Sequence, residues 1–253
     1  MYPIERQQKM IELLEEKGMM KLSALSKVLQ VSMETVRRDV QTLVEQGAVT
    51  KFYGGIKLVK HDKAESLLAT RLKENLSEKE RIAQRCANFI EEGDSIFLDS
   101  GTTTFHIAKY IKHYKQLTVI TNSLPIVLEL INSELNVIII GGKLRQSENS
   151  ITAYDFLFNF ERLNISKAFI CTSGISVEKG LSDFNVEEVQ TRRQIIHLAK
   201  KVFVAVDHSK FEKDVTVQIC DIKEIDYIVT DHTLDAVYAK KYEKQGVQII
   251  TTV

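Results

Sequence analysis

The chain has 253 residues, of which 44% are hydrophobic, so it can bury a core, and its length suggests two domains. Lys plus Arg and Asp plus Glu both number 34, and this neutral balance gives no sign of a polyanionic partner for the whole molecule. The first 60 residues nevertheless carry 10 basic and 7 acidic side chains, against 24 and 27 in the remainder. This mild asymmetry favours contact with nucleic acid near the N-terminus.

The cysteines and the hydropathy pattern indicate a cytoplasmic setting. Cys86, Cys171 and Cys220 are widely separated and show no C-x-x-C spacing, so we interpret them as reduced core residues. No apolar run reaches the ~18 residues needed to span a bilayer, and the start of the chain lacks a signal-peptide pattern. We therefore expect a soluble cytoplasmic protein without a membrane partner.

Three helices are predicted in the first 47 residues. Pro3 favours the first turn of a helix that ends near Gly18. In "KLSALSKVL" the apolar residues recur at a spacing of three or four and predict a second, short helix: Leu22, Leu25, Val28 and Leu29. A tight turn ending in the N-cap residue Ser32 then leads to a third helix over residues 33–47.

The third helix has one apolar face and one charged face. Its inward positions are Val36, Val40, Leu43 and Val44, and its outward positions are Met33, Glu34, Arg37, Arg38 and Gln41. Two adjacent outward arginines after a short helix and a three-residue turn are typical of the recognition helix of a helix-turn-helix. The alternative is a solvated charged face. Asp39 could hold one of the two arginines through a salt bridge.

A hairpin follows the third helix. "AVTKFYGGIKLV" has short β-prone runs on either side of Gly54-Gly55, which predicts the wing of a winged helix. Lys51, Lys57 and Lys60 would place positive charge there, where it can contact phosphate.

Residues 4–56 resemble the helix-turn-helix of the DeoR family of bacterial transcriptional regulators. The resemblance runs through "VSMETVRRDVQTLVEQGAVTKFYGG". It departs from the family at three positions, with Lys51 in place of the usual Arg, Tyr53 in place of His and Ile56 in place of Ala. The resemblance implies that the following residues contact double-stranded operator DNA: Ser32, Met33, Glu34, Thr35, Arg37, Arg38, Lys51 and Tyr53.

A charged helical segment is expected to connect two domains. Residues 59–76 read as a linker that includes a separate helix from Ala64 to Leu76, between a DNA-binding domain at 1–58 and an effector-sensing domain at 77–253. Ser77 followed by Glu80 has the spacing of a capping box for a helix that runs to about Ile90.

The remainder alternates strands and helices in the manner of a parallel α/β sheet. We predict strands at 95–99, 117–121, 136–140, 167–172, 201–206, 227–230 and 248–251. Several end in small polar residues or glycine, as in "DSGTTT", "TNS", "GGKLR", "TSGIS" and "DHSK". In open α/β sheets, ligands bind beyond the carboxyl ends of the strands.

"SIFLDSGTTTFHIAKYI" joins a buried strand to a helix and predicts a cradle for an anion at the helix N-terminus. Lys143, Arg145 and Lys210 would add cations at the same edge of the sheet. The spacing matches neither the Walker motif nor the G-x-G-x-x-G dinucleotide fingerprint, so a small phosphorylated metabolite fits better than a nucleotide. An ordinary turn and N-cap is the alternative.

These motifs look like those of the DeoR-family sensor domain, which is similar in fold to ribose-5-phosphate isomerase and binds phosphorylated sugars. The resemblance implies an effector site made of Asp99, Ser100, Gly101, Thr102, Thr103, Thr104, Asn122, Gly141, Gly142, Lys143, Arg145, Ser173, Asp183, Glu187 and Lys210. The chain departs from the family in having no glycine between Gly142 and Gly174.

An enzymatic alternative would use Glu187 as a base with Lys210 and Asp99 nearby, but the isomerase motif Asp-Gly-Ala-Asp-Glu is absent. His106, His197 and His208 have no partners at metal-binding spacing, so we expect no metal and no cofactor. We predict a non-enzymatic regulator, most simply a repressor of a sugar-utilisation operon, with an activator as the alternative. Because one recognition helix reads few bases, a homodimer or homotetramer is expected.

Overall fold

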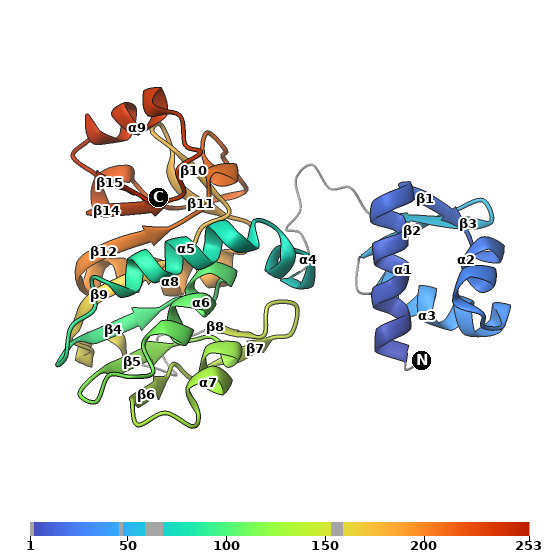
Figure 1. Ribbon diagram of the computed structural model, residues 1–253, viewed down its shortest axis with the longest axis horizontal. Helices are drawn as coiled ribbons and strands as arrows, with labels where there is room; N and C mark the ends of the chain where they lie inside the picture. Colours follow the sequence, from blue (N-terminus) through green and yellow to red (C-terminus); the bar gives the residue numbers. More distant parts are fainter. Residues whose placement is uncertain (1–2, 46–47, 59–67, 153–158, 253) are drawn as a thin grey trace. The chain divides into compact units, whose positions relative to one another are not determined.

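The computed structural model describes residues 3–45, 48–58, 68–152 and 159–252 (Figure 1). The chain divides into two compact units, Met1–Ala64 and Glu65–Val253. Each unit has its own core and is described separately below.

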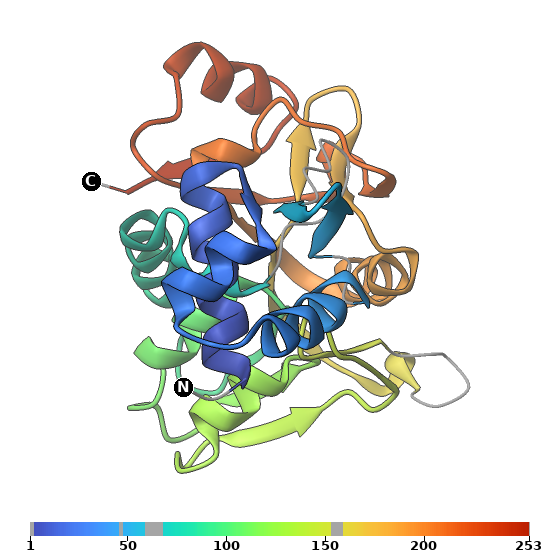
Figure 2. The same cartoon turned by 90° about the vertical axis from the view of Figure 1, so that its right-hand side faces the viewer.

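The first unit is a winged helix. Its helices are α1 (Pro3–Lys17), α2 (Leu22–Leu29) and α3 (Met33–Glu45), and its strands are β1 (Met19–Lys21), β2 (Val49–Phe52) and β3 (Gly55–Leu58). The strands form an antiparallel sheet in the order β1–β3–β2, and Figure 2 shows the β2–β3 pair from the side. The predicted helices and hairpin are confirmed, and β1 is an additional strand that residue patterning did not indicate.

The core of this unit contains one ion pair among apolar side chains. Val36, Val40 and Leu43 are buried as predicted, whereas Val28 is 50% exposed because it lies on the outer side of the short helix α2. Asp39 is buried and accepts hydrogen bonds from Arg6 of α1 at 2.5 and 3.1 Å. The prediction that Asp39 holds Arg37 or Arg38 is therefore wrong, because its carboxylate faces α1.

Two helices open the second unit. α4 (Leu68–Lys73) covers the middle of the predicted linker helix, whose first residues, 64–67, lie outside the described residues. α5 (Leu76–Ala87) begins after Asn75, which adopts a left-handed conformation with φ 49° and makes no side-chain cap. The predicted capping box is wrong, because the helix begins earlier and the Ser77 hydroxyl instead donates to Glu78 at 2.8 Å.

A seven-stranded parallel sheet forms the centre of the second unit. The strands, in spatial order, are β15 (Gln248–Thr251), β14 (Tyr227–Thr230), β12 (Ala199–Ala205), β9 (Ile165–Ile170), β4 (Ser95–Leu98), β5 (Thr118–Thr121) and β6 (Asn136–Ile139). Every neighbouring pair is parallel, with Leu98 opposite both Thr121 and Phe169. All seven predicted strands are present, which confirms the parallel α/β fold of this unit.

Helices cover both faces of this sheet (Figure 1). Ile96 and Leu98 of β4 pack with α5, α6 (Thr102–Tyr110) and α7 (Leu124–Leu130), whereas Phe97 between them packs with α8 (Val186–Leu198) on the other side. Strands buried on both faces read as continuous apolar runs, which is why the sequence indicates them clearly.

Short antiparallel strands lie beside the main sheet. β7 (Lys143–Arg145) pairs with β8 (Ser150–Thr152), and β10 (Gly174–Ser176), β11 (Gly180–Asp183) and β13 (Val217–Cys220) form a third sheet. A further α-helix is α9 (Ala236–Glu243), and short 3-10 helices lie at Phe160–Arg162, His208–Lys210 and Ile222–Glu224. Together these elements place the carboxyl ends of β4, β9 and β12 at one edge of the unit, next to the N-terminus of α6.

Replacing Asp39 should destabilise the winged-helix unit. Asp39→Asn removes the charge that balances the buried Arg6 guanidinium, and breaking a buried ion pair in this way typically costs about 3–5 kcal/mol. Urea unfolding of the full chain would measure the loss. Glu34→Gln, an exposed change on the same helix, should shift the free energy of unfolding by less than about 0.5 kcal/mol. Equal stability of the two variants would contradict a structural role for the Arg6–Asp39 pair.

Candidate functional site

The candidate recognition helix α3 begins with a local cap. Ser32 Oγ accepts the N–H of Thr35 at 3.2 Å and lies 2.9 Å from the Thr35 hydroxyl. The turn before it is fixed by the Ser26 hydroxyl, which donates to the carbonyl of Val31 at 2.6 Å. This arrangement orients the first turn of α3, so that the exposed side of the helix is presented rigidly.

The two arginines on that side are available for binding. Arg37 and Arg38 are exposed, and neither guanidinium has an ion-pair or hydrogen-bond partner among the described residues. Glu34 is exposed beside them, and Met33 is half-buried. Exposed guanidinium groups near a helix N-terminus suit contact with phosphate or guanine.

The wing carries the other predicted DNA contacts. Tyr53 is fully exposed at the tip of the β2–β3 hairpin, where Gly54 has φ +76°. Lys51 donates to Gln41 of α3 at 2.6 Å, which ties the wing to the candidate recognition helix. Lys60 lies outside the described residues.

The loop between β4 and α6 is held by its own polar groups. Thr104 Oγ1 accepts the N–H of Gly101 at 3.1 Å and donates toward the carbonyl of Asp99 at 2.6 Å. A Cβ at Gly101 would lie 2.3 Å from Cys171 Sγ, so the close approach of these strand ends requires glycine. The first N–H groups of α6 have no carbonyl within the helix to bond to, and they face the ends of the strands.

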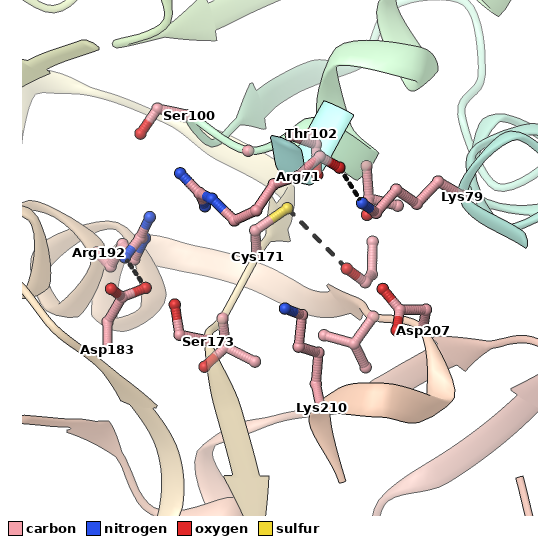
Figure 3. Close-up of a pocket in the computed structure, with 15 residues that line it drawn as sticks. Arg71, Lys79, Ser100, Thr102, Cys171, Ser173, Asp183, Arg192, Asp207 and Lys210 are labelled. Carbon is pink, nitrogen blue, oxygen red and sulfur yellow. Dashed lines mark hydrogen bonds and ion pairs between the residues drawn. The ribbon is translucent and has the colours of Figure 1, made fainter. Parts of the chain in front are cut away.

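A pocket opens in front of this helix N-terminus (Figure 3). Its lining comes from the ends of β4, β9, β11 and β12, from the start of α6, from α8, from the two helices that precede the sheet and from the short 3-10 helix His208–Lys210. The lining residues are Arg71, Lys79, Ser100, Gly101, Thr102, Thr103, Cys171, Thr172, Ser173, Asp183, Arg192, Ala205, Val206, Asp207 and Lys210. Four of them are cationic and two are acidic, so the pocket suits an anion that also carries hydroxyl groups.

The cations of the pocket differ in their partners. Lys210 points into the pocket, and its ammonium has no partner among the described residues (Figure 3). Arg71 forms an ion pair with Glu148, and Lys79 donates to the backbone carbonyls of Arg71 and of Glu74, the latter at 2.7 Å. Burial lowers the pKa of Lys79. A bound anion would act in the opposite direction, because a nearby negative charge favours the charged ammonium.

Arg192 joins the walls of the pocket from within the core. Its guanidinium donates to Asp99 at 2.7 Å and to Asp183 at 2.7 Å, and lies 3.5 Å from Glu188. Burial opposes the charge of Arg192, but these three carboxylates hold its pKa well above the usual range. Burial also raises the pKa of the Cys171 thiol, so Cys171 contributes no negative charge to the pocket.

The predicted effector residues fall into three groups. Those that line the pocket are Ser100, Gly101, Thr102, Thr103, Ser173, Asp183 and Lys210. Asp99 and Thr104 lie beneath the loop and hold it, and Asn122 donates toward Ser100 Oγ at 3.4 Å from the next strand. The remaining five are not in the lining. Lys143 pairs with Glu187 at 3.0 Å in an exposed position, Arg145 pairs with Glu188 at 2.9 Å, and Gly141 and Gly142 are exposed.

Four charged lining residues were not predicted: Arg71, Lys79, Arg192 and Asp207. Lys79 and Arg192 each occupy an inward position of an amphipathic helix, among Ile82 and Cys86 in α5 and among Val189 and Ile195 in α8. A charge on an apolar stripe is a signal that could have identified both.

Within the described residues, no cluster of three or more His, Cys, Asp or Glu side chains could hold a metal ion. A search of the same residues found no helix with the length and apolar character required to cross a membrane.

Comparison with known proteins identifies both units. The family model "DeoR C terminal sensor domain" matches residues 74–232, and "DeoR-like helix-turn-helix domain" matches residues 6–62. The regulator GolR of Listeria innocua is 32% identical over 98% of both chains, and the regulator IolR of Bacillus subtilis is 34% identical over 93% of this chain and 94% of its own. The transcriptional repressor GlcR of Bacillus subtilis is 31% identical over 100% and 97% of the two chains.

These matches are to DNA-binding regulators, which confirms the predicted resemblance and the prediction that the chain is not an enzyme. Among solved structures, a D-ribose-5-phosphate isomerase in complex with phospho-erythronic acid is 16% identical, covers 53% of this chain and 52% of its own, and has a TM-score of 0.40.

Replacing Arg192 should destabilise the second unit. Arg192→Met leaves Asp99, Asp183 and Glu188 buried around an apolar side chain, which should lower the free energy of unfolding by about 3–5 kcal/mol. The neighbouring Arg193 is exposed, so Arg193→Met should cost less than about 0.5 kcal/mol. Chemical denaturation of both variants compares the two costs. Equal stabilities would show that the buried network does not hold the unit together.

Proposed function

Because the chain belongs to the DeoR family of transcriptional regulators, we propose that it represses a sugar-utilisation operon and that a phosphorylated sugar alters its affinity for the operator. The observation that carries the effector proposal is the Lys210 ammonium, which points into the pocket and has no partner among the described residues. A buried or half-buried cation without a counterion favours an anionic ligand.

Phosphate is the anion that this pocket suits best. The N-terminus of α6 offers unbonded N–H groups and the positive end of its dipole, and the hydroxyls of Ser100, Thr102 and Thr103 lie at the same place. Lys210 faces this helix end from the opposite wall. Phosphate oxygens can therefore accept hydrogen bonds from backbone, hydroxyl and ammonium donors together.

The acidic and hydroxyl side chains of the pocket favour a polyhydroxylated ligand. Asp183 and Asp207 are acceptors at the pocket surface, and Ser173 can donate or accept. Asp183 is held by Arg192, and Asp207 accepts from Asn75 at 3.0 Å, so both carboxylates are fixed in position. Sugar hydroxyls donate to such carboxylates, whereas a second phosphate would be repelled by them.

On the DNA side, we propose that Arg37 and Arg38 contact operator phosphate or base edges, with Ser32, Met33, Glu34 and Thr35 next to them and Lys51 and Tyr53 on the wing. The protein would bind its operator as a homodimer or homotetramer, because two recognition helices are needed to read two half-sites. The effector must bind the DNA-free and DNA-bound forms with different affinities, since equal affinities would shift nothing.

A titration with sugar phosphates tests the effector site. Fluorescence anisotropy on labelled DNA from upstream of the gene should show release of the operator by one phosphorylated sugar and no response to the unphosphorylated sugar. Thr103→Asp places a carboxylate at the first turn of α6, where it suits the helix dipole but repels phosphate, so operator binding should persist while the response falls at least about tenfold.

The matched control is Asn132→Asp, which adds the same charge in an exposed turn after α7 and should respond as the wild type does. A retained response in Thr103→Asp would place the effector elsewhere. Tighter operator binding upon addition of the effector would contradict simple release and would favour an activator or a co-repressed system.

Replacing Arg37 tests the DNA-binding surface. Arg37→Ala should weaken operator binding by about 1–3 kcal/mol, or roughly 5- to 150-fold, because a guanidinium contact to a base or phosphate is lost. Arg162→Ala removes an exposed arginine from the second unit and should leave the affinity unchanged. Unchanged affinity in Arg37→Ala at physiological salt would overturn the assignment of this helix face.

A further inference from the structure

The short helix α4 is the first described element of the second unit. It spans Leu68–Lys73 and is the first described element after residues 59–67, which lead out of the winged-helix unit. A helix of six residues is not stable in isolation, because nucleation is costly and few hydrogen bonds follow it. The helical state of α4 therefore depends on its contacts with the rest of the second unit.

Two cations and a pair of leucines provide those contacts. Arg71 pairs with Glu148, a buried carboxylate in the turn between β7 and β8. Lys79 of α5 donates to the carbonyls of Arg71 and Glu74 and so satisfies the C-terminal end of α4. Leu68 and Leu72 line an apolar recess whose other wall includes Phe105 and Pro125.

The same two cations line the candidate effector pocket. Arg71 and Lys79 both belong to its lining together with Ser100 to Thr103, and Figure 3 shows both side chains at the α6 side of the pocket. The side chain of Arg71 thus reaches from α4 toward the helix end that we propose for phosphate, while its guanidinium is paired with Glu148. The positive charges of Arg71 and Lys79 would therefore serve both to bind the ligand and to hold α4 in place.

We propose that Arg71 and Lys79 are coupling residues: an anionic effector draws them from Glu148 and from the carbonyls of α4, which loosens α4 and changes the affinity for DNA. The proposal rests on the proposed function in taking phosphate as the anion. A phosphate carries up to two negative charges and three acceptor oxygens, so it attracts the Arg71 guanidinium more strongly than the single carboxylate of Glu148 does, and the two anions compete for the position of that side chain. Binding of the effector therefore favours the state in which the ion pair between Arg71 of α4 and Glu148 of the β7–β8 turn is broken.

The matched variants are Glu148→Gln and Asp94→Asn. Glu148→Gln removes the charge that competes for Arg71 and keeps the side-chain shape. Asp94→Asn removes a carboxylate that pairs with Lys167 at 2.6 Å before β4, at the opposite ends of the strands from the pocket. Arg71→Gln breaks the same contact from the other partner and replaces Glu148→Gln if that variant does not fold.

Two readouts separate the coupling from the effector proposal. The first is hydrogen exchange of the α4 amides, such as the Glu74 N–H that bonds to the Thr70 carbonyl at 3.1 Å, measured on the full chain with and without inorganic phosphate. The second is operator affinity by anisotropy. Without ligand, Glu148→Gln should accelerate α4 exchange at least about tenfold and change operator affinity at least about fivefold, whereas Asp94→Asn should change neither.

Two results would overturn the coupling. In the first, Glu148→Gln exchanges its α4 amides and binds the operator as the wild type does. In the second, Glu148→Gln exchanges its α4 amides faster but its operator affinity is unchanged. If phosphate or a sugar phosphate alters operator binding while α4 exchange stays constant, the proposed function stands and the coupling fails. If no phosphorylated compound affects the wild type but Glu148→Gln changes both readouts, the coupling stands and the proposed effector class fails.

Discussion

The loops that form the pocket are joined by the guanidinium of Arg192, which donates to Asp99 and Asp183 from inside the core. Asp99 in turn accepts the N–H groups of Ser100 at 2.8 Å and Cys171 at 3.0 Å, so one carboxylate fixes the chain at the ends of both β4 and β9. Because every member of this network is buried and paired, the pocket is formed before any ligand arrives.

The main sheet was predictable because its central strands are buried on both faces. β4, β9, β12 and β14 appear in the sequence as apolar runs that end in small polar residues, and the chain reverses through a helix after most of them. β1 and the β10–β11–β13 sheet were not predicted. β1 and β13 pair with strands distant in sequence, β3 and β11, and β1 and β10 have only three residues each, so periodicity carries too little information.

The site was predicted where motifs follow strands and missed where charges lie on helices. Ser100 to Thr103 and Lys210 belong to recognisable loop segments, whereas Lys79 and Arg192 lie within helices to which no binding role was assigned. Lys143 follows a predicted strand, yet it pairs with Glu187 in an exposed position and does not line the pocket. Position after a strand therefore indicates part of this pocket, but it misses the lining residues on helices and does not determine which side chains turn inward.

The cations of the pocket have unequal parts in binding and response. In the proposed function, an anion that reaches Lys210 replaces no partner among the described residues, so this contact would contribute affinity. An anion that reaches Arg71 must compete with Glu148, so that contact contributes less affinity but changes the protein. A site built only from cations like Lys210 would bind the anion tightly but would not change the conformation of the protein. A pocket that is to act on a separate DNA-binding unit can do so through a residue whose existing partner the ligand replaces, and Arg71 is such a residue in the proposed coupling.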